Sequence, residues 1–577
     1  MFHSPTASIR QTQRVPRSCV SCSARKVKCD KSVPCRTCIR RGKADVCIRE
    51  MVIVRGEVTT YREAPDIPTY EELKCENERL QGIISSFTAQ DIITASRSSP
   101  KDFTAPVETD SCTLSRGQLL EQDEDGLEQE LWDDLTHNSQ FVAPMISNWS
   151  DIVLPSLACS EHLIDFDEMW NSWVHYALEY PRFRRECSAF MAEIDNGTPI
   201  ELMNTPWMAV YFSVLSAALL IMDEDHAEKV TANEASSHHQ LSRMWYEAAI
   251  FCLNRSDFMR YPNIHSVQAI AVLGICFNNF GDSDLSCHMW SCALRIAQRL
   301  GLNTPYSQEA GHYLSKESQH RLWWTLVICE WLSIPYHAPA VDEDDFDVPY
   351  PEPPPCSTSA TSGLEQAHPV HYHLFMARAA TASYRFRRSL RYKTGSTAEN
   401  TIQAVKAADE ELASIIDTLP FHLQPETSPE NDAGLHNIDK TMPWVKWQRF
   451  DLTLVLLHLR IRVNRTLQRQ WSLNSNSSQI EWARTICNQS AQSIIWINSN
   501  WDQPTSARKQ WALSYHIFTA AILLLHESQH AEETNAASFK DAIMTAVTLL
   551  DAVKIQSALA HSASTMLKSR IQAIGLN

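Results

Sequence analysis

Residues 19–38 read CVSCSARKVKCDKSVPCRTC, and one more cysteine follows at position 47. The stretch has the spacing C-x2-C-x6-C-x5-C-x2-C-x8-C, formed by Cys19, Cys22, Cys29, Cys35, Cys38 and Cys47. Zinc prefers four thiolate ligands arranged as a tetrahedron. Six thiolates can therefore satisfy two zinc ions only if two of the sulfurs bridge both ions. The spacing predicts a small metal-binding domain at residues 19–47 with two Zn2+ ions as its cofactors.

A set of disulfides is the alternative explanation for these cysteines. The N-terminal sequence MFHSPTASIRQTQR has no apolar core of the signal-peptide type. Paired C-x2-C motifs in an intracellular chain are typical of metal sites rather than of disulfides. The other 11 of the 17 cysteines are scattered between Cys75 and Cys487, as expected for free thiols in a reducing compartment. We therefore favour the metal site.

The charge of the chain is divided unevenly. The net charge is −17, yet residues 1–62 contain 14 Lys and Arg against 4 Asp and Glu. This N-terminal part is therefore basic, and the remainder is strongly acidic. Such a division suits a protein in which only the basic end touches nucleic acid. Residues 1–18 are expected to form a disordered basic arm.

The cysteine spacing and the basic run resemble the binuclear zinc cluster (Zn2Cys6) of fungal transcription factors, a module that places a helix in the DNA major groove. The resemblance implies that the first and fourth cysteines, Cys19 and Cys35, are the bridging ligands. It also implies that residues 23–28 (SARKVK) form a short helix whose N-terminal end meets the base edges.

The same resemblance implies roles for the basic residues. Lys26 aligns with the lysine that reads a CGG triplet in the family, and guanine offers its N7 and O6 acceptors to such a lysine. Arg25 and Lys28 are expected to hold phosphates, which positions the domain without reading sequence. A solvated surface residue is the alternative for any single charge, above all for those at positions 40–43. The predicted DNA-binding residues are Arg25, Lys26, Lys28, Arg36, Arg40 and Arg41.

A short dimerisation helix is predicted after a linker at residues 48–68. Thr69 and Glu72 form a capping box, which marks a helix start, and the helix is expected to span residues 69–88. Its heptad places Tyr70, Asn77 and Ile84 at a positions and Leu73, Leu80 and Phe87 at d positions. A buried asparagine at an a position favours a two-stranded coiled coil. An ordinary amphipathic helix that packs on the C-terminal region is the alternative to this homodimer.

Residues 89–157 are expected to be mostly disordered and acidic. They include EQDEDGLEQELWDDL at positions 121–135, where acidic residues alternate with leucine and tryptophan. Acidic stretches with embedded aromatic residues often act as activation segments. A solubilising linker, or a short helix docked on the C-terminal region, explains the composition equally well.

Residues 158–577 are predicted to form one large all-helical domain, which makes the chain mostly α. Glycine is scarce, with 14 residues, and apolar residues recur with a helical period. Two such stripes are Leu241, Met244, Trp245, Ala248 and Cys252, and Trp447, Phe450, Leu454, Leu457 and Ile461. The run from Trp511 to Leu525 is interpreted as a buried helix rather than a membrane span.

Two stretches of this region resemble the fungal-specific transcription-factor domain, also called the middle homology region. They are SCALRIAQRLGLN at positions 291–303 and SQHRLWWTLVICEWLSIPYHAPAVDEDDFDVPYP at positions 318–351. Glu330 stands where the family usually has aspartate, and residues 336–339 (YHAP) replace the common Gly-Arg-Pro. The resemblance covers roughly residues 160–400 and implies a regulatory domain.

One motif points to a different class of protein. Residues 526–530 read HESQH, which matches the H-E-x-x-H signature of zinc peptidases. In that reading His526 and His530 would bind zinc and Glu527 would act as general base. No motif marks a third ligand, so we expect a polar helix end, no catalytic residues and no enzyme.

The sequence thus predicts a nuclear, sequence-specific regulator of RNA polymerase II transcription that binds double-stranded DNA as a homodimer and reads CGG-type half-sites. By analogy with the family, it would control one metabolic pathway or one biosynthetic gene cluster. Its other expected partners are the transcription machinery or co-activators and a small-molecule effector, with no membrane. The alternatives are a zinc-dependent hydrolase and a ligand-sensing repressor or scaffold.

Overall fold

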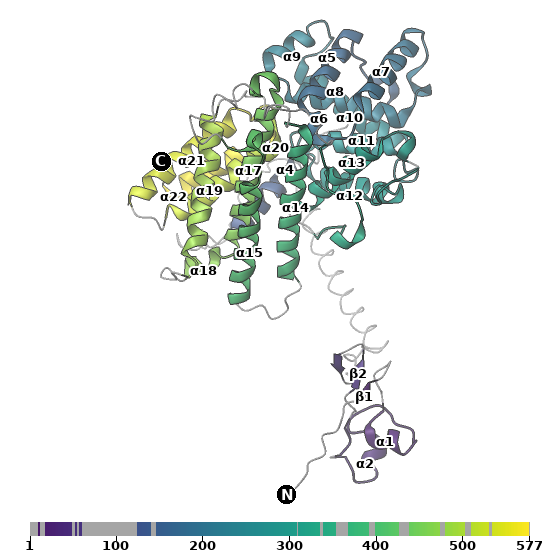
Figure 1. Cartoon of the computed structure of the whole chain (residues 1–577), viewed down its shortest axis with the longest axis vertical. Coiled ribbons are helices and arrows are strands. Elements are labelled where there is room, and N and C mark those ends of the chain that lie inside the picture. The colour runs from purple at the N-terminus through teal and green to yellow at the C-terminus, as the bar shows by residue number, and fades with distance from the viewer. Residues whose placement is uncertain are drawn as a thin grey trace, which may run out of the picture. The chain divides into compact units, whose positions relative to one another are not determined.

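The computed structural model describes residues 10–11, 18–44, 46–48, 52–54, 57–59, 124–139, 146–308, 310–334, 338–353, 367–391, 398–425, 438–473, 479–501, 509–529 and 533–575 (Figure 1). They fall into two units, Met1–Cys112 and Thr113–Asn577. We call the first unit the head and the second the body, and each is described by itself. The predicted coiled coil at residues 69–88 lies outside the described residues.

The head contains two short helices and a small sheet. The helices are α1 (Val20–Ala24) and α2 (Arg36–Ile39). The strands β1 (Arg10–Gln11), β2 (Val52–Val54) and β3 (Glu57–Thr59) are hydrogen-bonded in that order. β1 runs parallel to β2 with Arg10 opposite Val52, and β2 runs antiparallel to β3 with Val52 opposite Thr59.

β1 lies within the predicted basic arm at residues 1–18, and β2 and β3 lie within the predicted linker at residues 48–68. β2 has the sequence Val-Ile-Val and β3 has Glu-Val-Thr, and β-branched residues favour strands. Val54 pairs with Glu57 at the end of the β2–β3 ladder.

In the body, every regular element that the structure describes is helical, as predicted. The helices are α4 (Glu124–Ser139), α5 (Leu157–Trp170), α6 (Ser172–His175), α7 (Tyr180–Asp195), α8 (Thr205–Ile221), α9 (Glu224–Val230), α10 (His238–Arg255), α11 (Ile264–Leu273), α12 (Ser283–Arg299), α13 (Lys316–Trp331), α14 (Pro369–Arg391), α15 (Ala398–Asp417), α17 (Trp444–Arg465), α18 (Gln468–Leu473), α19 (Glu481–Asn500), α20 (Trp511–Glu527), α21 (Glu533–Asp551) and α22 (Ala558–Ile574). In Figure 1 the blue and teal helices gather on one side and the green and yellow helices on the other.

Local signals place the ends of these helices. Asn204 caps α8 by accepting a hydrogen bond from the N–H of Trp207, and Pro206 follows in the first turn. Ser315 caps α13 in the same way. At the other end of the chain, Gly575 stops α22 with a φ of 70°, a conformation that glycine adopts without strain.

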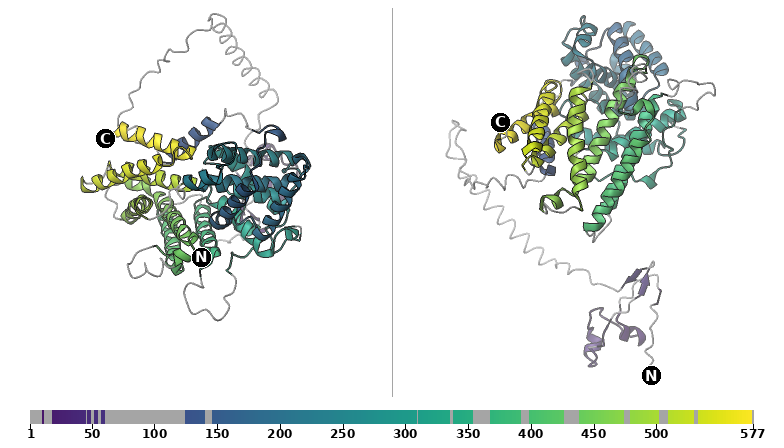
Figure 2. Two further views of the ribbon diagram at one scale, coloured as in Figure 1. Left: turned by 90° about the horizontal axis from the view of Figure 1, so that it is seen from above. Right: turned by 60° about the vertical axis from the view of Figure 1, so that its left-hand side comes forward.

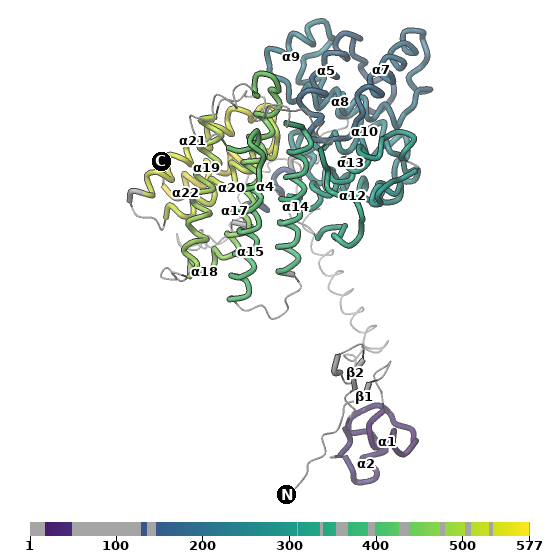
Figure 3. Tube along the Cα trace, viewed as in Figure 1, coloured from purple at the N-terminus to yellow at the C-terminus, as the bar shows by residue number. Residues whose placement is uncertain are grey.

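Two helices are buried on nearly every face and form the centres of the two groups. α8 packs against α10, α11 and α5, and α20 packs against α19, α21 and α22. The α20 stretch was predicted to be a buried helix, and its apolar residues from Leu513 to Leu525 are indeed buried. The tube in Figure 3 shows α14, α15 and α17 running side by side. None of the described helices is both long and apolar enough to cross a membrane.

Two tryptophans of α13 hold the segment that follows this helix. Trp324 of α13 donates from its indole Nε1 to the carbonyl of Pro349 at 2.7 Å, and Trp331 donates to that of Val341 at 3.1 Å. Glu330 accepts from the N–H of Ala340. The indole donors therefore fix the acidic segment after α13 through backbone hydrogen bonds, and the glutamate that replaces the family's aspartate takes part.

Part of the acidic stretch that was predicted before the all-helical domain forms a helix of the body. Residues 124–139 form α4, which packs against α22, α12 and α20 (Figure 2). The side chains of Leu131, Trp132 and Leu135 are 3% exposed or less. Within residues 89–157, which were expected to be mostly disordered, α4 thus forms a helix packed on other helices of the body, as one of the alternatives had it. Burial of one apolar face outweighs the high charge of the stretch.

Candidate metal centre and nucleic-acid interface

Each C-x2-C pair of the head builds the same local structure. Cys19 precedes α1 and its Sγ accepts from the N–H of Cys22 at 3.4 Å. Cys35 precedes α2 and its Sγ accepts from the N–H of Cys38, also at 3.4 Å. A cysteine at the cap of a short helix thus points its sulfur toward the cysteine three residues later. The head contains this unit twice.

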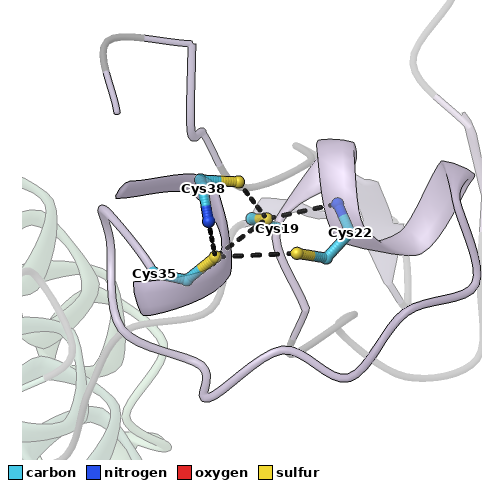
Figure 4. Close-up of side chains that lie close together, drawn as sticks. All are labelled: Cys19, Cys22, Cys35 and Cys38. Carbon is cyan, nitrogen blue, oxygen red and sulfur yellow. Dashed lines mark hydrogen bonds between the residues drawn. The ribbon is translucent and has the colours of Figure 1, made fainter. Parts of the chain in front are cut away.

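The two C-x2-C pairs of the head bring their sulfurs together (Figure 4). Cys19 Sγ and Cys35 Sγ are 3.8 Å apart. Cys19 also reaches Cys38 of the second pair at 3.8 Å, and Cys35 reaches Cys22 of the first pair at 3.6 Å. A tetrahedron with zinc–sulfur bonds of about 2.3 Å has edges of about 3.8 Å. The sulfurs therefore stand at the spacing that a tetrahedral zinc site requires.

The remaining cysteines extend this cluster. The Sγ of Cys47 accepts from the N–H of Cys35 at 3.3 Å. Cys29 offers its sulfur within 4.8 Å of that of Cys35. The sulfurs of Cys19, Cys22, Cys35 and Cys38 also lie within 4.8 Å of one another. The structure thus brings all six predicted ligands into one region, and the four cysteines of the C-x2-C pairs are arranged to hold a metal ion.

The protonation of the cluster also fits a metal site. Burial raises the pKa of Cys19 and Cys22. Burial would also raise the pKa of Cys35, but the N–H of Cys38 and the neighbouring thiols lower it to about 6. The contact with Cys35, together with burial, raises the pKa of Cys38 to about 12. Burial and the contacts between the thiols therefore shift these pKa values in opposite directions. Cysteine binds a metal in its deprotonated form, so a cation would take the place of the thiol protons.

The structure places the predicted base-reading lysine differently from the expectation. α1 ends at Ala24, so residues 23–28 are not a helix that presents its N-terminal end. Lys26 instead follows the C-terminal end of α1 and has a φ of 53°. The N–H of Val27 then bonds to the carbonyl of Cys22 at 3.1 Å, which closes the helix.

The second unit has the same helix end, but with glycine in place of the lysine. Gly42 has a φ of 65°, and the N–H of Lys43 bonds to the carbonyl of Cys38 at 3.0 Å. Glycine is the usual residue at this left-handed position, and a side chain there adds backbone strain. A strained residue at an exposed site points to a function for its side chain. Lys31 of the head is also exposed and has a φ of 70°, so the left-handed backbone by itself does not single out Lys26.

The other predicted DNA contacts are all exposed. Arg25 and Lys28 flank Lys26, and Arg40 and Arg41 follow α2. Arg36 lies near Asp30, whose carboxylate accepts from the N–H of Arg36 at 3.0 Å and so caps α2. The structure brings Arg25, Lys26 and Lys28 to the end of one helix and Arg36, Arg40 and Arg41 to the other helix.

In the body, α4 is held by a largely buried carboxylate, that of Glu128. Arg465 donates to Glu128 Oε1 at 2.6 Å, and the Tyr515 hydroxyl donates to Oε2. Burial would raise the pKa of Glu128, but Arg465 and Arg462 lower it below its usual value. Trp132 packs edge-on against Trp511 with ring centroids 6.4 Å apart. A docked helix was one of the alternatives for this stretch, but its ion pair could not be predicted, because Glu128 and Arg465 are 337 residues apart.

The peptidase-like motif does not present a general base. Glu527 is 1% exposed, accepts from Arg484 Nε at 2.6 Å and from Trp471 Nε1 at 3.2 Å. Burial opposes ionisation of Glu527, yet His526 and Arg484 lower its pKa to about 2. A carboxylate tied to an arginine and an indole is not available to a metal-bound water. His530 lies outside the described residues.

Comparison with known proteins finds a family match within the body. Residues 169–394 match the model of the fungal specific transcription factor domain. "Transcriptional regulator AacuB" of Aspergillus aculeatus is 23% identical over 382 residues, which are 56% of this chain and 50% of that protein. "Transcriptional regulator nsrM" of Aspergillus novofumigatus is 21% identical over 348 residues, 56% of this chain and 48% of that protein. The chain spans about half the length of these relatives.

A solved structure shares the fold. The K. lactis CBF3 core contains a chain that superimposes with a TM-score of 0.51 at 13% identity, covering 78% of this chain and 92% of that one. The matched family region extends from the end of α5 to the end of α14 and includes both stretches that were singled out in the sequence. Residues 169–394 of the body are therefore similar to the fungal specific transcription factor domain.

Proposed function

We propose that this protein is a nuclear, sequence-specific DNA-binding regulator of RNA polymerase II transcription, with a head that holds two Zn2+ ions. One observation carries the proposal. Cys19 and Cys35 lie within 3.8 Å of each other, and each also contacts a cysteine of the opposite pair. Two sulfurs in this position suit the role of shared ligands between two metal ions.

The six cysteines then divide into two overlapping sets of four. The first set is Cys19, Cys22, Cys29 and Cys35. The second set is Cys35, Cys38, Cys47 and Cys19. Bound zinc would supply the fixed cross-link that a domain of this size cannot obtain from apolar burial. The chain's own contribution is to cap each helix with a cysteine and so aim both pairs at one centre.

DNA reading is assigned to the exposed basic side chains of the head. Lys26 donates to guanine in the major groove of a CGG-type half-site. Arg25 and Lys28, with Arg36, Arg40 and Arg41, hold the phosphates on either side. A homodimer formed through residues 69–88 presents two heads and therefore reads two half-sites. The relatives that are named transcriptional regulators support this class of function.

The body is proposed to control the acidic helix α4. Acidic segments with aromatic residues recruit the transcription machinery or co-activators when they are exposed. Here Trp132 is 3% exposed, and Glu128 is bound to Arg465. A docked α4 is therefore masked, and its release would activate transcription. A protein that keeps α4 docked would instead act as a repressor or scaffold.

Metal content and DNA selection test the head. We expect the full-length protein to contain two zinc ions per chain by elemental mass spectrometry, and Cys35→Ser to lose both because it removes a shared ligand. Cys287→Ser, at an exposed cysteine of α12, is the matched control. In selection from random duplexes the wild type should enrich CGG triplets and Cys35→Ser should enrich none. One zinc per chain, or unchanged selection by Cys35→Ser, contradicts the proposal.

Chromatin occupancy tests the pathway. By analogy with the family that the sequence resembles, a regulator of one metabolic pathway or one biosynthetic gene cluster is the expected type. The wild type should then occupy the promoters of one neighbouring gene set, and Cys29→Ala should occupy none of them. Scattered sites would indicate a broad regulator, and sites retained by Cys29→Ala would mean that the body reaches DNA through other proteins.

A further inference from the structure

The body contains a cavity of about 240 Å³ that the functions above do not use. It lies where α11, α12, α13 and α14 meet α17 and α20. Its walls are mostly apolar and include the rings of Trp290, Trp511 and Tyr372. The space is several times the roughly 30 Å³ that one water molecule takes up in the liquid, so it can hold a small organic molecule.

Several buried polar side chains line the cavity without a protein partner. His458 is 2% exposed, and in the part of the chain that the structure describes neither ring nitrogen has a hydrogen-bonding partner. The same holds for Nδ1 of His516 and Nδ1 of His373, which are 4% and 2% exposed. Buried polar atoms are normally satisfied, so a group of them around one cavity points to something that satisfies them.

Two smaller groups add to this set. Asn278 Oδ1 and Ser283 Oγ are also buried without a partner among the described residues, and both side chains line the cavity. The polar atoms thus come from both sides, since Asn278 and Ser283 lie beside α11 and α12 while His458 and His516 belong to α17 and α20.

The electrostatics of the wall indicate the charge of the occupant. Burial lowers the pKa of His516 and of His373 to about 3, and it lowers that of His458 well below the usual value. The three imidazoles are therefore neutral at physiological pH, and each offers one N–H and one acceptor nitrogen. The wall also carries Arg462 and two carboxylates, Asp451 and Glu330. The carboxylates already accept hydrogen bonds from the Tyr372 hydroxyl and the N–H of Ala340. Because charges of both signs line the wall and the carboxylates have partners, the neutral imidazoles are the groups left for an uncharged molecule.

The shape of the wall indicates a flat occupant. The rings of His458 and His516 are stacked with centroids 4.4 Å apart and planes 23° from parallel. Together with the indoles of Trp290 and Trp511, they give the cavity several planar surfaces. Planar apolar surfaces favour ring systems that stack on them.

We propose that this cavity binds an uncharged, ring-containing small molecule that carries hydroxyl or carbonyl oxygens. His458 is its main hydrogen-bonding contact, with His516 and Asn278 as further contacts, and the aromatic walls hold the rings. Trp511 lines the cavity and also packs against Trp132 of α4. A bound molecule could therefore affect the docking of α4, and this regulatory role rests on the proposed function.

Calorimetric titration of the zinc-loaded full-length protein with 2-naphthol tests the site. This probe has two fused rings and one hydroxyl group, while naphthalene lacks the hydroxyl and 2-naphthoate is charged. We expect one 2-naphthol to bind per chain, naphthalene to bind at least tenfold more weakly, and 2-naphthoate not to bind.

His458→Phe keeps a planar ring but removes both nitrogens. It should weaken the binding of 2-naphthol at least tenfold without weakening the binding of naphthalene. The matched control is His422→Phe. His422 is also buried, its pKa is also lowered by burial, and its Nε2 also lacks a partner among the described residues, but it does not line the cavity. His422→Phe should bind 2-naphthol as the wild type does.

Three results would overturn the proposal: no binding of 2-naphthol to the wild type, unchanged 2-naphthol binding by His458→Phe, or an equal loss in His422→Phe. The titration contains no DNA, so it does not depend on the zinc cluster reading a half-site. Failure of DNA selection with intact 2-naphthol binding would reject the proposed function of the head and leave the cavity site standing.

Discussion

The head and the body are stabilised by different means. Among the described residues of the head, the buried apolar cluster consists of cysteines, and large side chains such as Val20, Ile39 and Ile48 are exposed. The body has a continuous core to which nearly all of its helices contribute. A domain without an apolar core depends on its cross-links, whereas one with a large core does not.

The comparison also separates two ways of placing polar groups. In the head, the six predicted cysteine ligands lie within 29 residues of sequence, and two short helices orient the C-x2-C pairs. In the body, Glu128, Arg465 and the cavity histidines meet only because distant helices pack together. The first kind of site can be recognised in a sequence, and the second cannot.

Removing metal should produce the largest difference between the two units. Structural zinc contributes about 10–16 kcal/mol to the folding of small zinc domains. We expect a strong chelator to unfold the head completely and to leave the helical signal and the unfolding midpoint of the body unchanged. Circular dichroism and amide hydrogen exchange on the same sample would measure both. Exchange protection that persists at Cys22 and Cys38 after chelation would mean that the head folds without metal.

Trp132→Ala should have the next largest effect. Truncation of a buried tryptophan costs about 3–5 kcal/mol, and here the loss falls on the docking of α4. We expect α4 to become accessible to proteases and to exchange rapidly while α8 remains protected. In a reporter assay, release of α4 should raise transcription from a target promoter.

Asp134→Ala is the control for that experiment, because Asp134 lies on the exposed face of the same helix. It changes the composition of α4 without removing a buried group, so α4 should stay docked. If Trp132→Ala lowers transcription although α4 is released, the helix does not act as an activating segment.

These outcomes bear on what the sequence could predict. The all-helical body and the cysteine cluster follow from local patterns, and both predictions are confirmed. The docking of α4 remained one of several alternatives, because the charges on the stretch obscure its apolar face of Leu131, Trp132 and Leu135. The left-handed position of Lys26 was missed, because it depends on where a five-residue helix stops.

The cavity shows the limit most clearly. His458, His516 and His373 lie on three helices, and nothing in the sequence distinguishes them from the other histidines of the chain. A histidine on an apolar helix face is usually a satisfied core residue. Only the packed structure shows that these side chains face one space and lack partners among the described residues.

Acid should destabilise the body through these histidines. Their pKa values are below the usual 6.5 in the folded state. As the pH falls below 6.5 the unfolded chain takes up protons that the folded chain does not, so the free energy of unfolding decreases. Between pH 7 and pH 5 each histidine should remove about 2 kcal/mol.

Asp451 acts in the opposite direction. Burial raises its pKa from 3.8 to about 6. Its ionised form is therefore disfavoured above pH 6, and this penalty is relieved as the pH falls from about 6 to about 4. Urea unfolding at pH 7 and pH 5 measures the sum. His516→Phe should be less sensitive to acid than the wild type, and an equal sensitivity would mean that His516 is already protonated in the folded protein.

The smallest effect on stability, and the sharpest test of the head, is expected for Lys26→Gly. Glycine adopts a φ of 53° freely, so this change should leave the stability of the head unchanged or raise it by about 1 kcal/mol. Lys26→Ala removes the same charge but keeps the strain. Both variants should lose about 1–3 kcal/mol of discrimination for a guanine in the half-site, as measured by competition between matched and mismatched duplexes.

A uniform loss on all duplexes would place Lys26 on a phosphate. If Lys26→Gly bound the half-site as well as the wild type, the lysine would have no role in reading DNA, and its left-handed position would be strain without function. The glycine at the equivalent position of the second unit, Gly42, shows that the fold alone does not require a lysine there.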